Sequence, residues 1–226
     1  MLYLILFCFV LLIIYGPSLW VRHVLHKHST PIEGMPGTGA ELAIHLVERF
    51  KLKEVQVVRG GVGENYYSPE EKIVCLSPDV FDGKSLTAVA VAAHEVGHAI
   101  QFNNEEPVTK LRQRYLGKAL LVKRVGSIIL MSIPIFTLVL KSPVVMFFGI
   151  AVGLITMLSS VFMYAAILPE EYDASYKKAL PILAQGYLPE THMPAAREIL
   201  KACALTYVAA ALTDVLSLWR WFRMIR

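Results

Sequence analysis

The residues of this chain best suited to chemistry are two histidines and the acid between them, in the run His94-Glu95-Val96-Gly97-His98. Residues four apart in an α-helix lie one turn apart on one face, so the two imidazoles would point together. Imidazole nitrogens at that spacing suit a zinc ion. Glu95 would lie beside the metal, placed to take a proton from water. The sequence therefore predicts zinc ligands at His94 and His98 and a general base at Glu95. The plainer alternative is a helix whose histidines donate hydrogen bonds to carbonyls.

Two protein ligands do not make a stable zinc site, so a third is expected elsewhere. A third histidine on the same helix would need glycine at 101 and histidine at 104, but the chain has Gln101 and Asn104. A glutamate from a later helix, as in gluzincins, remains possible. The late acids considered are Glu170, Glu171, Asp173, Glu190 and Glu198. Glu171 is the favoured ligand and Asp173 the favoured carboxylate to orient a histidine, but spacing leaves the choice between them open. Both acids could also simply complement a helix dipole.

The elements that must position these residues have the pattern of a small α+β domain. Ser85 is the expected N-cap of a long helix, Leu86–Asn103, that carries the motif between uncharged flanks. Ahead of it, apolar residues at helical spacing predict a helix over Ala40–Phe50. Short strand-like runs between Glu54 and Leu76 predict a small antiparallel meander.

The rest of the chain is strongly apolar. Of 226 residues, 55% are hydrophobic and 18% charged, whereas roughly a quarter are charged in an ordinary domain. Disorder and a disulfide scaffold are therefore excluded. Met1–Val21 has no Lys, Arg, Asp or Glu and as a helix would cover about 30 Å, enough to cross a membrane. Val125–Leu140 and Val144–Leu168, separated by three residues, predict a transmembrane helical hairpin. The alternative is a hairpin buried in a protein core.

Basic residues follow the first apolar run and precede the hairpin, which predicts that the loop 22–124 lies on the cytoplasmic side. A hairpin returns the chain to the side it left, so residues 169–201 would face the same compartment. The last run, Ala202–Trp219, is expected to be an amphipathic or membrane helix. Because the basic residues behind the net charge of +4 lie beside these runs, the predicted partner is a lipid bilayer and not nucleic acid. The zinc motif adds a peptide or protein substrate, membrane proteins included, as the other predicted partner.

Three stretches carry a family resemblance: V-A-A-H-E-V-G-H-A-I-Q at 91–101, L-P-E-E-Y-D-A-S at 168–175 and A-L-T-Y-V-A-A-A at 204–211. Over essentially its whole length the chain resembles the YugP-type family of membrane neutral zinc metallopeptidases, and more distantly the HtpX/Ste24-type membrane proteases. The resemblance implies Zn²⁺ held by His94, His98 and Glu171, with Glu95 as the base. Those proteases have an aspartate four residues after the glutamate, where this chain has Ser175. Asp173 therefore stays open as an alternative ligand or an outer carboxylate.

These observations together predict a mainly α membrane protein with a small α+β gluzincin-like catalytic domain, an N-terminal anchor and a helical hairpin. The expected parts are an anchor at 1–21, a zinc-binding catalytic domain at 22–124, the hairpin at 125–168 and a helical segment at 169–226 that supplies the third ligand. The expected function is a zinc-dependent metalloendopeptidase, multi-pass in the cell membrane, with its catalytic domain on the cytoplasmic side. A site-2-type intramembrane protease and a non-catalytic zinc-binding scaffold are the alternatives, and the scaffold would not need Glu95.

Overall fold

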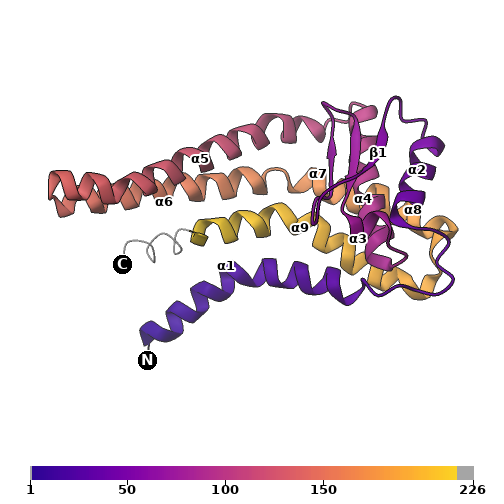
Figure 1. Cartoon of the computed structure of the whole chain (residues 1–226), viewed down its shortest axis with the longest axis horizontal. Helices are drawn as coiled ribbons and strands as arrows, with labels where there is room; N and C mark the ends of the chain where they lie inside the picture. The colour runs from indigo at the N-terminus through magenta and orange to yellow at the C-terminus, as the bar shows by residue number, and fades with distance from the viewer. Residues whose placement is uncertain (1, 218–226) are drawn as a thin grey trace. The chain divides into compact units, whose positions relative to one another are not determined.

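A computed structural model describes residues 2–217 of the chain, and helices make up most of it (Figure 1). In chain order the elements are α1 (Leu2–Lys27), α2 (Gly39–Arg49), β1 (Gln56–Arg59), β2 (Tyr66–Ser68), β3 (Ile73–Leu76), α3 (Pro78–Phe81), α4 (Leu86–Asn103), α5 (Thr109–Leu140), α6 (Pro143–Ala165), α7 (Leu168–Tyr172), the π-helix η1 (Asp173–Ala179), α8 (Leu180–Ile182), the π-helical η2 (Leu183–Tyr187), the 3₁₀ helix η3 (Glu190–His192) and α9 (Met193–Ser217). Two compact units result. Of the described residues, the mixed unit comprises 20–110 and 169–205, and the helical unit comprises 2–19, 111–168 and 206–217.

Helix α4 is the centre of the mixed unit. Every residue from Leu86 to Gln101 is buried, which requires a helix that other elements cover on all sides. Those elements are α2, α3, β2, β3, η1 and α8. The predicted N-cap is confirmed: the Ser85 side chain accepts a hydrogen bond from the backbone N–H of Ala88 at 3.1 Å. The helix therefore begins and ends where the sequence predicts, and it holds the histidines inside the unit.

The sheet lies beside this helix, and its topology differs from the predicted antiparallel meander. The strand order is β1-β3-β2, with β1 parallel and β2 antiparallel to β3. The loop that follows β1 crosses the end of β3: Gly60 N–H donates to Leu76 O at 2.8 Å, and Asn65 Oδ1 accepts from Ser77 N–H at 2.9 Å. A Cβ at Gly60 would lie 2.4 Å from Cys75 Sγ, so glycine is needed where the loop passes so closely. The run Gly60-Gly61-Val62-Gly63 lies in this crossover between the two sides of β3 and is not a turn between neighbouring strands.

The helical unit is built around α5 and α6, which run antiparallel and are joined by Lys141 and Ser142 (Figure 1). Ala119, Tyr164 and Ile167 form its buried cluster. Gly149 lies so close to Ile133 that a Cβ there would be 2.8 Å from Ile133 Cγ1. Large apolar side chains of α6 nevertheless stay exposed, among them Phe147, Phe148 and Phe162. The two helices therefore bury only part of their apolar surface in each other.

The predicted membrane spans are not supported. Over the residues that the structure describes, no helix combines the length and the apolar character needed to cross a membrane. This finding overturns the anchor at 1–21, the transmembrane hairpin at 125–168, and with them the predicted fold class and the multi-pass, cytoplasmic-side localisation. The apolar runs instead lie in helices with other boundaries than those predicted: α1 continues to Lys27, and α5 begins at Thr109 and includes six basic residues. Apolar runs also form helix–helix contacts, and part of the apolar surface of α5 and α6 is buried in the contact between these two helices. The last predicted run, Ala202–Trp219, lies in α9 as far as Ser217, and Trp219 lies outside the described residues.

Candidate metal centre

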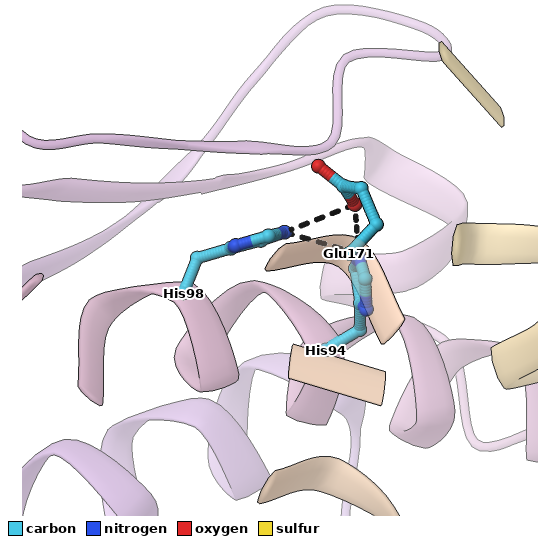
Figure 2. A group of neighbouring side chains, drawn as sticks. All are labelled: His94, His98 and Glu171. Carbon is cyan, nitrogen blue, oxygen red and sulfur yellow. Dashed lines mark hydrogen bonds and ion pairs between the residues drawn. The ribbon is translucent and has the colours of Figure 1, made fainter. Parts of the chain in front are cut away.

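The two motif histidines lie one turn apart on α4, deep in the mixed unit. His94 is 4% exposed and His98 is 1% exposed. Their rings are nearly perpendicular, with centroids 4.7 Å apart. Both Nε2 atoms converge on the carboxylate of Glu171 (Figure 2).

Glu171 lies in a different part of the chain, on the short helix α7. The backbone of η1, which follows, packs against α4 at the level of the motif. A Cβ at Gly97 would lie only 2.8 Å from Ala174 O, so the glycine between the histidines allows this close approach. The close packing of η1 on α4 places Glu171, which is 1% exposed, over the two rings.

The three donor atoms form a nearly equilateral triangle. His94 Nε2 and His98 Nε2 are 3.3 Å apart. Glu171 Oε2 lies 3.4 Å from His94 Nε2 and 3.3 Å from His98 Nε2 (Figure 2). Nitrogen and oxygen ligands about 2.0–2.1 Å from a tetrahedral zinc ion lie about 3.3–3.4 Å from one another. The triangle therefore matches one face of a zinc tetrahedron.

The chemistry of the donor set fits zinc as well as the distances do. His94, His98 and Glu171 each offer one ligand atom, all within 4.8 Å of one another and all buried. Two imidazoles and one carboxylate leave a fourth position free, as catalytic zinc sites do, whereas structural sites are closed by four protein ligands. The residues present thus fit a zinc ion.

The electrostatics of the cluster favour an ionised carboxylate. Burial raises the pKa of the Glu171 carboxyl, but the adjacent His98 and His94 rings lower it by more, so its pKa lies well below the usual range. Burial also raises the pKa of the Cys203 thiol, and the carboxylates of Glu95 and Glu171 raise it further. Both carboxylates thus act on the same buried thiol, and Glu95 is itself only 7% exposed.

The other late acids have different partners. Asp173 accepts a hydrogen bond from Gln101 Nε2 at 2.8 Å and pairs with Lys177 at 3.0 Å. Glu198 pairs with Lys27 and His28, and Glu190 is exposed in η3. Glu170 Oε1 lies 3.4 Å from Nδ1 of His98, the nitrogen that faces away from the triangle. Of the acids that the sequence leaves open, the structure brings Glu171 onto the Nε2 atoms of both histidines.

Sequence reasoning missed two polar residues that contact the histidines. Ser175 Oγ lies 2.9 Å from His94 Nδ1, and Gln101 Oε1 lies 3.0 Å from His98 Nδ1. In the sequence both positions stand out only as departures from known motifs. Helical spacing could have found them, because Gln101 is three residues after His98 and Ser175 four residues after Glu171.

Comparison with known proteins agrees with this geometry. The family described as "Putative neutral zinc metallopeptidase" matches residues 3–226 of the chain. A Bacillus subtilis protein named "Putative membrane protease YugP" is 31% identical over 222 residues, which cover 96% of this chain and 95% of that protein. No solved structure matches. The resemblance to the YugP-type family that the motifs predict is confirmed.

Proposed function

We propose that this chain, which belongs to the family of neutral zinc metallopeptidases, hydrolyses peptide bonds at a zinc ion held by His94, His98 and Glu171. The observation that supports the proposal is the triangle of donor atoms, whose three sides measure 3.3, 3.3 and 3.4 Å. Those separations are the ones expected between donor atoms at three corners of a zinc tetrahedron.

The three proposed ligands have two different roles at the metal. His94 and His98 are held rigidly because they lie on one buried helix, and Glu171 supplies the negative charge that partly balances the cation. When bound, zinc supplies Lewis-acid polarisation of the scissile carbonyl and lowers the pKa of water. Burial of all three side chains keeps the surrounding dielectric low, which strengthens each of these electrostatic effects.

Glu95 is the proposed general base. It follows His94 directly on α4 and is buried, and its carboxylate, like that of Glu171, raises the pKa of the Cys203 thiol. In the proposed reaction its carboxylate takes a proton from the attacking water and later delivers that proton to the leaving amine nitrogen. The C–N bond breaks, the water oxygen remains on the new carboxyl group, and Glu95 ends the cycle ionised as it began.

The test is the substitution Glu95→Gln in the full chain, which keeps the shape of the side chain and removes its basicity. Zinc content should be unchanged, while cleavage of casein and of model peptides should fall about 10²–10⁴-fold, the usual contribution of a general base. Glu48→Gln is the matched control, since Glu48 is an exposed glutamate of α2. Cleavage that survives Glu95→Gln with zinc bound would contradict the assignment. Zinc binding without any cleavage by the unaltered chain would favour the non-catalytic scaffold.

A further inference from the structure

Both imidazoles of the cluster make a second contact, on the ring nitrogen that faces away from Glu171. His94 Nδ1 contacts the hydroxyl of Ser175, and His98 Nδ1 contacts the side-chain amide of Gln101. Ser175 and Gln101 are both fully buried. Each of these residues has a further partner, and those partners determine which way the hydrogen bond to the histidine must run.

The hydroxyl of Ser175 has one proton to donate, and it donates that proton to the backbone carbonyl of Leu200 at 3.0 Å. A hydroxyl oxygen still has lone pairs with which to accept. The contact with His94 at 2.9 Å must therefore be donated by the ring, so Nδ1 of His94 carries the proton. The other ring nitrogen, Nε2, then presents a lone pair toward Glu171 and the proposed metal position.

Gln101 imposes the same arrangement on His98. Its Nε2 donates to the backbone carbonyl of Glu170 at 3.0 Å and to Asp173 Oδ2 at 2.8 Å. A carbonyl oxygen can only accept a hydrogen bond, and so can the carboxylate oxygen of an ionised Asp173. The remaining atom, Oε1, is an acceptor, so His98 Nδ1–H donates to it at 3.0 Å. The Glu170 carboxylate, 3.4 Å from the same nitrogen, favours the proton there as well.

We propose that Ser175 and Gln101 are positioning residues that hold His94 and His98 in the Nδ1–H tautomer, with both Nε2 lone pairs directed at the metal. Asp173 acts through Gln101, not on the metal: its carboxylate fixes the amide that fixes the ring. Lys177 at 3.0 Å and Lys178 at 3.8 Å hold Asp173 in turn. This inference rests on the metal site of the proposed function, but it assigns roles to residues that take no part in the reaction itself.

The first test compares Ser175→Ala with Ser77→Ala in the full chain. Ser77 is a matched control because it too is fully buried and its hydroxyl donates one hydrogen bond, to Asn65 Oδ1 at 3.1 Å. Zinc affinity, measured by competition with a chromophoric chelator, should fall about 10–100-fold in Ser175→Ala, the usual cost of losing a partner behind a metal-bound histidine. It should not change in Ser77→Ala. Urea unfolding of both proteins in chelator measures any loss of stability separately from zinc binding.

A spectroscopic signature distinguishes positioning from a general structural role. In ¹H–¹⁵N spectra of the zinc-loaded chain, the Nδ1 protons of His94 and His98 should both be protected from solvent exchange by their acceptors. Ser175→Ala should remove the protection at His94 and leave that at His98, and Gln101→Leu should do the reverse. Equal zinc affinity in Ser175→Ala and Ser77→Ala, or protection at His94 that survives Ser175→Ala, would overturn the inference.

A double-mutant cycle tests whether Asp173 acts through Gln101. Asp173→Ala alone should lower zinc affinity up to about tenfold, since Asp173 lies one hydrogen bond further from the His98 ring than Gln101 does. In a Gln101→Leu background it should have no further effect, because the amide that connects it to His98 is gone. Equal losses in both backgrounds would show that Asp173 acts on the site independently.

The outcomes separate this inference from the proposed function. Zinc binding with the expected variant pattern but without peptide cleavage would overturn the peptidase proposal alone. Cleavage that depends on Glu95, combined with unchanged zinc affinity in Ser175→Ala and Gln101→Leu, would overturn the positioning proposal alone. An unaltered chain that binds no zinc would overturn both.

Discussion

Glu171 and Asp173 are two residues apart in the sequence and yet have separate partners. Two residues along a helical turn correspond to a rotation of about 200°, so their side chains leave the backbone in nearly opposite directions. Glu171 faces His94 and His98, and Asp173 faces Gln101 and the lysines of η1. One residue can hold the metal directly, and the other can reach it only through an intermediate side chain.

The substitutions Glu171→Gln and Asp173→Asn should therefore have very different effects. Glu171→Gln removes a proposed ligand and its charge, so we expect zinc affinity to fall more than about 100-fold, beyond the loss that outer partners usually cause. Asp173→Asn keeps an oxygen that can accept from Gln101, so its loss should stay below about tenfold. Competition with a zinc chelator measures both. A larger loss in Asp173→Asn than in Glu171→Gln would mean that Asp173, and not Glu171, binds the metal directly.

At this scale the sequence could name the candidates but could not choose between them. The spacing of His94 and His98 implies a shared face because both lie on one helix, and the structure shows that face. The direction of Glu171 depends on how η1 packs on α4, which local spacing does not contain. Ser175 and Gln101 share a helix face with Glu171 and His98 by spacing, but their residue types are ordinary, and burial is what sets them apart from surface residues.

At the scale of elements, the contact between α4 and η1 is what assembles the cluster. Gly97 is the point of closest approach, where α4 has no side chain and Ala174 O occupies the space. The π-helical η1 begins at Asp173, immediately after the helix that carries Glu171. π-Helical turns are rare and often occur at functional sites. In this chain the wider turn belongs to the segment that carries both Asp173 and Ser175.

Gly97→Ala should separate these two elements. The added Cβ would meet Ala174 O at 2.8 Å, so the elements must shift apart. Overpacking of this kind costs about 1–3 kcal/mol, against a gain of up to about 1 kcal/mol from helix propensity. We expect a net loss of stability in urea unfolding and a fall in zinc affinity, because Glu171 moves away from the histidines.

Gly117→Ala is the matched control for this prediction. Gly117 also lies inside a helix, α5, but a Cβ there would meet nothing within 4 Å. The substitution should therefore stabilise the chain by about 0.5–1 kcal/mol and leave zinc affinity unchanged. If Gly97→Ala behaves like Gly117→Ala in both measurements, the close approach is not what places Glu171.

The elements themselves were predictable to different degrees. Helix α4 was predictable with its N-cap at Ser85, because capping and uncharged flanks are local signals. Helix α2 matches its prediction within one residue at each end, and Thr38 and Glu41 form a capping box at its start. The pairing of β1 with β3 was not predictable, because it depends on a loop crossing the end of a strand. That crossing leaves no pattern beyond glycines that also suit a simple turn.

At the scale of the whole molecule, the mixed unit is made from two separate segments of the chain. The first, residues 20–110, carries His94 and His98, and the second, residues 169–205, carries Glu171. Apolar run lengths favour a membrane-crossing interpretation of the helices between them, but no described helix meets the requirements for a span. The length of an apolar run could not distinguish a membrane-spanning helix from a helix packed on other helices, because both kinds can be equally apolar.

Because the proposed metal joins these two segments, zinc should stabilise the entire mixed unit and not only the site. A ligand that binds the folded chain alone stabilises it by RT ln(1 + [L]/Kd), about 2.7 kcal/mol when free zinc is 100 times Kd. We expect the unfolding free energy in urea to rise by that amount from chelator to buffered zinc, and to follow the logarithm of free zinc above Kd. Ser77→Ala should show the same dependence, and Glu171→Gln should show almost none over the same range. An equal rise in Glu171→Gln would mean that zinc stabilises the chain at another place, and that the two segments are not joined through this cluster.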